Sequence, residues 1–188
     1  MTRRTLIVGD VHGCARELDR LLRKADADRI ILVGDLFTKG PDPRGVWDLI
    51  REHTLEAVIG NHDVDTLNHW TPGKALPRKA FRWLRRLRPL IHEAGWSVAH
   101  AGVHPVRGAR KTDAERAIYR KNFQGRPWWK SYRRRRLIVH GHDASRGLID
   151  RRPYSLGLDT GCVRGGRLTG YLVGEDRLIS VRARRDYC

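Results

Sequence analysis

The sequence predicts an α/β fold, because strand-like apolar runs and helix-like segments alternate along its first half. Three short runs, rich in β-branched residues, each lead into Gly-Asp or Gly-Asn, as is typical of strands buried on both faces. Strand–helix–strand order requires crossover connections and therefore parallel strands. The later part of the chain holds further strand-like segments joined by Gly-rich turns. We expect a single domain over residues 1–188, with a parallel first half and a more antiparallel second half.

In the first half, three strands alternate with two helices. The predicted strands are residues 5–8, 30–33 and 57–59. The first helix ends before Asp26, and its apolar stripe comprises Leu18, Leu21 and Leu22. The second helix begins at Pro43, because proline fits the first turn of a helix. Its apolar face comprises Val46, Leu49 and Ile50.

In the second half, we expect two helices and five strands. Residues 77–88 have helical spacing with arginines on the outer face, and Pro89 stops this helix. Its inner face comprises Phe81, Leu84 and Leu87. Residues 112–122 form the other helix. The predicted strands are residues 96–100, 137–139, 154–158, 168–173 and 178–181.

Composition and charge exclude several classes of protein. The chain has 188 residues, and 40% hydrophobic content with six Trp excludes a disordered protein. It has no apolar run long enough to span a membrane, and the run after the basic start is too short for a signal peptide. Three cysteines make no disulfide framework and suit the cytoplasm. The net charge of +17 favours polyanionic partners, such as nucleotides, polyphosphate, nucleic acid or an anionic membrane surface.

Polar residues that can hold metal ions follow the predicted strands. Ligand sites of α/β sheets lie at the carboxyl ends of strands, so these side chains are expected to converge. They are Asp10, His12, Asp35, Asn61, His100 and His142, with His62 and Asp63 beside Asn61. A single Asp after a strand usually caps a helix, and a single His usually lies on the surface. Five strand ends that all carry such residues beside Gly are hard to explain as caps.

The types of these residues indicate the metal. Carboxylate, amide and imidazole ligands without Cys suit Mn, Fe, Zn, Co or Ni better than Ca. Six ligands are too many for one catalytic ion that keeps open positions. They suit two ions about 3.5–4 Å apart that share a bridging carboxylate.

The chain resembles the PPP-type calcineurin-like metallophosphoesterases in the order and content of five sequence blocks. These are Gly9-Asp10-Val11-His12-Gly13, Gly34-Asp35, Gly60-Asn61-His62-Asp63, His100-Ala101-Gly102 and Gly141-His142. The resemblance implies a central β-sandwich flanked by helices, with a dinuclear metal site at its edge. It also implies that His62 is the catalytic acid and that His142, rather than His140, is a ligand. One ion would be held by Asp10, His12 and Asp35, and the other by Asp35, Asn61, His100 and His142.

Departures from the family pattern indicate the branch. Thr38 and Lys39 stand where PPP protein phosphatases have an Asp that supports the catalytic His and an Arg that grips phosphate. Together with Asp63 and the segment 158–169, they resemble the symmetrical diadenosine tetraphosphatase branch. Its members cleave diadenosine tetraphosphate, polyphosphate or RNA caps. Lys39 keeps the positive charge but not the fork of Arg, and Arg164 replaces a common aromatic residue, which weakens base stacking.

The resemblance implies a hydrolase of phosphoanhydrides. A hydroxide that bridges the two ions would attack phosphorus, His62 would protonate the leaving oxygen, and Lys39 and Asn61 would contact the phosphate. Manganese is the first choice of metal, with Fe, Zn, Co, Ni or Mg as alternatives. The expected substrate is a dinucleoside polyphosphate, preferably diadenosine tetraphosphate, or polyphosphate. Further phosphate contacts are open among Arg107, Arg110 and Arg146.

Other functions stay open at this point. A serine/threonine phosphoprotein phosphatase is the main alternative, followed by a polyphosphatase or RNA-cap hydrolase of the same branch. From another class, a basic nucleic-acid-binding module without activity would fit the charge, but such a module would have lost metal ligands, and none is missing.

Overall fold

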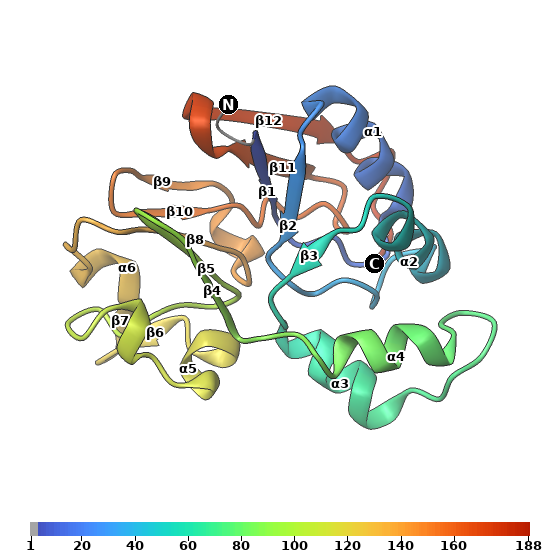
Figure 1. Cartoon of the computed structure of the whole chain (residues 1–188), viewed down its shortest axis with the longest axis horizontal. Coiled ribbons are helices and arrows are strands. Elements are labelled where there is room, and N and C mark those ends of the chain that lie inside the picture. The colour runs from blue at the N-terminus through green and yellow to red at the C-terminus, as the bar shows by residue number, and fades with distance from the viewer. Residues whose placement is uncertain (1–3) are drawn as a thin grey trace.

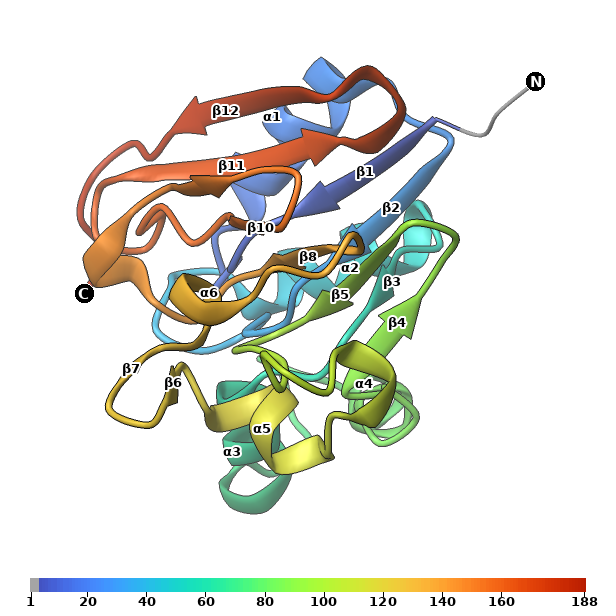
Figure 2. The same ribbon diagram turned by 90° about the vertical axis from the view of Figure 1, so that its left-hand side faces the viewer.

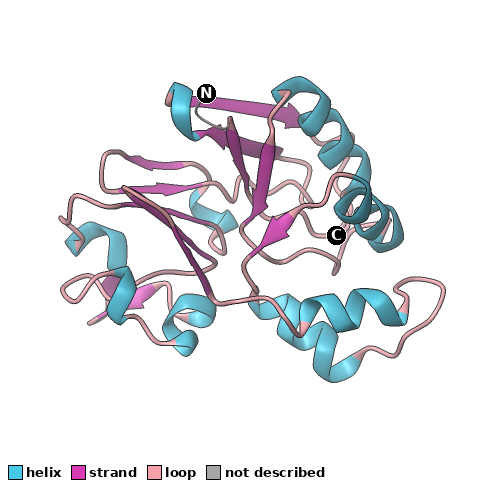
Figure 3. Ribbon diagram, in the orientation of Figure 1, coloured by secondary structure: helices cyan, strands magenta, loops and turns pink. Residues whose placement is uncertain are grey.

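A computed structural model describes residues 4–188, and positions 1–3 of the basic N-terminal segment lie outside it. Two five-stranded sheets pack face to face, and helices cover their outer sides (Figures 1 and 3). The predicted α/β class and the central β-sandwich flanked by helices are therefore confirmed. None of the helices in the described range is both long and apolar enough to cross a membrane.

The first sheet has the order β12-β11-β1-β2-β3. Its parallel part comprises β1 (Thr5–Val8), β2 (Arg29–Leu32) and β3 (Glu56–Ala57). The late strands β11 (Arg167–Leu172) and β12 (Arg177–Arg182) complete it in antiparallel fashion, with β11 beside β1. β3 is shorter than the predicted strand and starts one residue earlier, because Val58 instead forms an isolated bridge to Arg88.

The second sheet has the order β4-β5-β8-β10-β9. In chain order, its strands are β4 (Leu90–His92), β5 (Trp96–Ala99), β8 (Leu137–His140), β9 (Ile149–Arg151) and β10 (Ser155–Gly157). The outer pairs are antiparallel as predicted, but β5, β8 and β10 run parallel to one another. The sequence analysis missed β4 and β9, which are three-residue edge strands with too little alternation to be recognised.

The helices near the first sheet follow the predictions in part. α1 (Ala15–Ala25) and α2 (Pro43–Glu52) agree with them, and Pro43 takes the first position of α2. α4 (Arg78–Leu84) ends four residues early, because the chain then turns toward the Arg88 bridge and β4. α3 (Asn61–His69) was not predicted, since its first turn consists of polar residues of the site.

The outer face of the second sheet is covered by smaller elements. They are α5 (Ala114–Tyr119), the hairpin of β6 (Asn122–Phe123) and β7 (Arg126–Pro127), and α6 (Trp128–Ser131) (Figure 2). The predicted helix 112–122 is thus wrong at its end, where β6 begins after a short connection. Residues of this layer, including buried Trp128 and Tyr132, pack against Ile138 of β8.

Burial on both faces explains the continuous apolar runs in the sequence. In β1, Ile7 faces the other sheet, whereas Leu6 and Val8 face the helices. The layer between the sheets includes Ile7, Ile31 and Val33 from one sheet and Val98, Val139 and Leu156 from the other. This packing fixes the two sheets against each other and brings the loops that follow their parallel strands to one edge.

Candidate functional site

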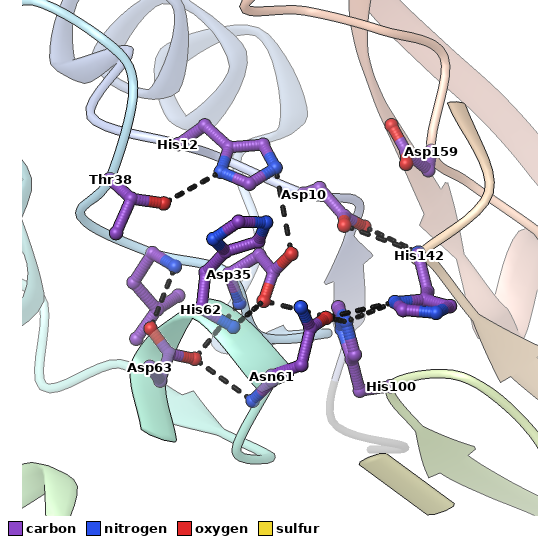
Figure 4. Close-up of polar contacts among 12 residues, drawn as sticks. Asp10, His12, Asp35, Thr38, Asn61, His62, Asp63, His100, His142 and Asp159 are labelled. Atoms are coloured by element: carbon purple, nitrogen blue, oxygen red, sulfur yellow. Dashed lines mark hydrogen bonds and ion pairs between the residues drawn. The ribbon is translucent and has the colours of Figure 1, made fainter. Parts of the chain in front are cut away.

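The structure brings the six predicted ligands and His62 together at that edge of the sandwich (Figure 4). They come from both sheets. Asp10 and His12 follow β1, and Asp35 follows β2, all in the first sheet. The second sheet contributes His100 after β5 and His142 after β8, while Asn61 and His62 begin α3. The convergence that the sequence predicts is therefore present, and the role of each residue stays a prediction.

Asp35 lies at the centre of the cluster. Its Oδ2 atom is 3.5 Å from His12 Nε2, and its Oδ1 atom is 3.4 Å from His100 Nε2. At this site, potential metal-binding atoms form two groups in which all atoms lie within 4.8 Å of one another, and both groups contain Asp35, whereas a third group in the described residues, Cys14, Glu17 and Cys162, lacks it. One group is Asp10, His12 and Asp35, and the other is Asp35, His100 and His142. A carboxylate that bridges two cations needs this arrangement, with one oxygen toward each group.

Hydrogen bonds orient the imidazoles toward Asp35. The carbonyl oxygen of Val33 lies 2.9 Å from His100 Nδ1, which must therefore carry the proton and leave a lone pair on Nε2. Asn61 Oδ1 lies 2.9 Å from both His100 Nε2 and His142 Nδ1, so at Nε2 it faces a lone pair as a neighbouring ligand atom rather than a hydrogen-bond acceptor. His12 Nδ1 lies 3.2 Å from the Thr38 hydroxyl. Partners of this kind fix the rings of metal-binding histidines in proteins.

Burial keeps these histidines neutral. It lowers the pKa of His12 to about 2 and the pKa of His100 and His142 to about 3, with smaller contributions from neighbouring positive charges. Only a neutral imidazole has a lone pair for a metal ion. The electrostatics of the site thus hold its imidazoles in the form that binds metal.

The carboxylates of the site crowd one another. Burial raises the pKa of Asp10 well above its usual value, and repulsion by Asp159 and Asp35 adds to the effect. Burial also raises the pKa of Asp35 to about 6. Buried carboxylates this close are stable in ionised form only beside positive charge. The donor set of carboxylates, neutral imidazoles and an amide therefore fits a pair of divalent cations of the first transition row.

Asp63 stabilises the backbone of the site, a role that the sequence analysis missed. Its carboxylate accepts hydrogen bonds of 2.9 Å from the backbone N–H groups of Asp35, Leu36 and Gly60. The loop after β2 and the start of α3 are thereby joined through one side chain, which is fully buried. The signal was present in the sequence, because an acidic residue three positions into a helix commonly bonds back to the residue that caps it.

Two glycines allow the carboxylates to approach the backbone. A Cβ atom at Gly60 would overlap Asp35 Oδ1, and one at Gly141 would overlap Asp10 Oδ1. The adjacent side chains are carried on left-handed backbone, with φ values of 54° at Asp35 and 72° at His142. Such conformations are uncommon outside glycine and cluster at functional sites. The recurrence of Gly beside the polar residues in the sequence thus has a steric cause.

His62 lies beside the two groups without belonging to either. Its backbone N–H donates to Asp35 Oδ1 at 2.9 Å, and its ring lies edge-on to the ring of His12. Thr38 contacts His12 rather than His62. Asp65 Oδ2 lies 3.8 Å from His62 Nδ1, which is within ion-pair distance but too far for a hydrogen bond. Asp65 belongs to the next turn of α3, and not to the segment after Gly34-Asp35 in which the PPP protein phosphatases have their supporting Asp.

Positive side chains surround the opening of the site. Lys39, Lys121 and Arg164 line a small pocket of about 170 Å³ together with Asp143 and Asp159. The sequence analysis missed Lys121, Asp143 and Asp159 as site residues, because no motif marks the first two and Asp159 was considered only as part of a longer block. None of the three arginines left open lines this pocket, although Arg146 donates to Asp143, which does, at 2.8 Å.

The neighbouring histidines of β8 offer a test of the ligand assignment. We expect His142→Ala to lower metal affinity by more than the roughly 10–100-fold that loss of a supporting residue costs. His140 is buried, its Nδ1 lies 3.3 Å from the Gly141 carbonyl, and its ring packs on Trp128. We therefore expect His140→Ala to keep its metal and to lose stability instead. Metal content after dialysis, with thermal unfolding as the control, separates the two variants. If His140→Ala lost its metal and His142→Ala kept it, His140 would be the ligand, and the match of Gly141-His142 to the family pattern would be wrong.

Comparisons with known proteins agree with this geometry. The family model described as calcineurin-like phosphoesterase matches residues 3–178. A symmetrical bis(5'-nucleosyl)-tetraphosphatase of Cellvibrio japonicus is 32% identical over an alignment of 125 residues that covers 54% of this chain and 46% of that protein. The chain thus spans about half the length of this relative.

Two further relatives match over almost their whole length. The asymmetrical bis(5'-nucleosyl)-tetraphosphatase PrpE of Oceanobacillus iheyensis is 26% identical, over 96% of this chain and 93% of that protein. The crystal structure of a candidate diadenosine tetraphosphatase has a TM-score of 0.89 and 32% identity, over 97% of this chain and 95% of that one. None of these relatives is named for binding nucleic acid, so the expectation of a nucleic-acid partner finds no support here.

Proposed function

Because the chain belongs to the calcineurin-like phosphoesterase family, whose members hydrolyse phosphoesters or phosphoanhydrides with divalent metal ions, we propose that it hydrolyses dinucleoside tetraphosphates. The observation that carries the proposal is the position of Asp35, with one carboxylate oxygen toward each of two ligand groups. This donor set suits the divalent metal ions with which members of the family carry out hydrolysis. The substrate follows from the names of the relatives and from the cations at the opening of the site.

Two ions, manganese by preference, would supply Lewis-acid chemistry, polarising the phosphate and activating water. Asp10, His12 and Asp35 would hold one of them, and Asp35, Asn61, His100 and His142 the other. Thr38 and the Val33 carbonyl hold the rings of His12 and His100 in the orientation this requires. Asp63 positions Asp35 through the backbone.

The remaining residues act on the substrate. Lys39 lies exposed at the opening, where its ammonium can neutralise a phosphate oxygen, and Arg164 lines the same pocket. Asn61 can donate from its amide nitrogen while its oxygen faces the histidines. His62 reaches the solvent side of the cluster and would protonate the leaving oxygen, with Asp65 stabilising its positive charge. A phosphate leaving group needs this proton less than an alkoxide does.

Product identity tests the proposal. We expect catalytic efficiency on diadenosine tetraphosphate to exceed that on medium-chain polyphosphate, and both to exceed that on a phosphoserine peptide. Symmetrical cleavage gives only ADP, which is the outcome we expect, whereas asymmetrical cleavage gives ATP and AMP. Because several cations contact an extended anion, the preference should weaken between about 50 and 200 mM salt.

A phosphopeptide preferred tenfold or more would contradict this function and favour the protein phosphatase. Preference for polyphosphate or capped RNA would select the other activities of the same branch. The assay is run with Mn, Co, Mg and Zn in turn, since the donor set suits several divalent ions.

A further inference from the structure

The site pocket is too small for the substrate that we propose. Its volume is about 170 Å³, whereas pockets for small molecules usually measure about 300–1,000 Å³. It can take the reacting phosphate groups, but the rest of a dinucleoside polyphosphate must lie on a neighbouring surface. A second pocket, of about 590 Å³, is lined by residues of α1, of the loop before α2 and of the C-terminal segment.

Three chain segments connect the two pockets. Lys39 lines the site and Pro41 lines the second pocket, so their Cα atoms are at most about 7 Å apart. His12 lines the site, and Arg16, which lines the second pocket, follows it by four residues at the start of α1. On the third segment, the N–H of Tyr187 donates to the carbonyl of Val163 at 2.9 Å, which places the wall of the second pocket against the wall of the site.

The second pocket carries unpaired positive charge. The exposed guanidinium groups of Arg16 and Arg184 make no ion pair with any residue of the described range, and Arg185 lies over the ring of Tyr187 at 5.6 Å. Guanidinium groups bind phosphate through two parallel hydrogen bonds.

Both carboxylates in this pocket are engaged by the protein. Glu17 Oε1 accepts from the Tyr187 hydroxyl at 2.9 Å and from the backbone N–H of Arg184 at 3.1 Å. Asp42 Oδ1 accepts from the N–H of Gly45 at 2.7 Å. The buried Glu17 thus ties the C-terminal segment to α1 and holds the arginines at the rim, rather than pairing with their guanidinium groups.

From this geometry we infer that Arg16, Arg184 and Arg185 form a second subsite, which binds the distal phosphates of an extended polyphosphate substrate. The inference rests on the proposed function for its substrate class. A dinucleoside polyphosphate and inorganic polyphosphate offer the same anionic chain to these residues. A phosphate monoester ends within the site and does not reach them.

The test compares an extended substrate with a short one in a single triple variant, Arg16→Gln/Arg184→Gln/Arg185→Gln. We expect the ratio of kcat/KM for diadenosine tetraphosphate to kcat/KM for p-nitrophenyl phosphate to fall by about 10-fold, chiefly through KM. Tripolyphosphate serves as a competitive inhibitor of p-nitrophenyl phosphate hydrolysis, and its inhibition constant should rise by a similar factor. An effect on both ligands supports a subsite for phosphates, whereas an effect on the dinucleotide alone would overturn it, because tripolyphosphate offers the same anionic chain.

The matched control removes three arginines of another surface pocket, Arg78 and Arg82 of α4 and the next residue after it, Arg85, in Arg78→Gln/Arg82→Gln/Arg85→Gln. It carries the same loss of charge, and we expect the ratio to stay unchanged. An equal fall in the control, or no change in the first variant, would overturn the subsite. If the unaltered protein hydrolyses p-nitrophenyl phosphate but not diadenosine tetraphosphate, the proposed function fails, and the tripolyphosphate inhibition constants still decide the subsite.

Discussion

Asp35→Asn is expected to lower kcat by at least about 10³-fold, because several kcal/mol of transition-state stabilisation depend on the two metal ions that Asp35 would bridge. The amide keeps one oxygen but loses the negative charge and the second acceptor. Its oxygen can still accept the N–H of His62, which donates to Asp35 Oδ1 at 2.9 Å. The protein should therefore remain folded and hold fewer ions per chain.

Metal content, kcat and thermal unfolding are measured together on this variant. Asp48→Asn is the matched control, since Asp48 forms a salt bridge with Arg44 on α2, away from the site. A variant of Asp35 that binds two ions per chain with near-normal activity would show that the dinuclear assignment is wrong.

His62→Ala is expected to lose activity according to the leaving group. General acid catalysis contributes roughly 10²–10⁴-fold, so losses of this size should occur with alkoxide leaving groups. Smaller losses are expected with p-nitrophenolate and with phosphoanhydrides, whose leaving groups are weaker bases. The dependence of log kcat on leaving-group pKa should therefore become steeper in the variant.

Retention of metal separates this role from ligation. His62 lies in neither ligand group, so His62→Ala should keep the metal content of the unaltered protein. His69→Ala on the same helix, where the ring Nδ1 lies 3.1 Å from the Asp65 carbonyl, is the control. A drop in bound metal on loss of His62 would identify it as a ligand and contradict the assignment.

Patterns of local sequence predicted the frame of the fold well. The apolar runs of β1 and β2 were visible because both faces of these strands are buried, as Ile7 and Leu6 show. Gly beside the polar residues marked the strand ends, since a Cβ atom at Gly60 or Gly141 would overlap Asp35 or Asp10, and one at Gly9 or Gly34 would overlap neighbouring backbone. The convergence of the predicted ligands followed from this frame alone.

Features that depend on tertiary contacts were not predictable in the same way. α3 begins with polar residues that serve the site, so it lacks an apolar stripe. Lys121 and Asp143 reach the pocket from connections whose course no local pattern specifies. The partner of His62 also came from an unexpected place, because Asp65 acts across one helical turn. A domain spanning residues 1–188 and a cytoplasmic location both stay predictions.

The position of β1 between β2 and β11 governs the order in which the chain can fold. Leu6 pairs with Ile30 on one side and with Leu172 on the other. One edge of β1 therefore stays unpaired until β11, near the C-terminus, is available. Until β11 is synthesised, this edge exposes unpaired backbone groups that could pair with other chains. Such non-local pairing also slows folding, because a long loop must close first. Asp10, just after β1, accepts the N–H of His142, another contact between distant parts of the sequence. The ligand group of Asp35, His100 and His142 likewise requires loops from both sheets to be in place, whereas Asp10, His12 and Asp35 all follow the first two strands.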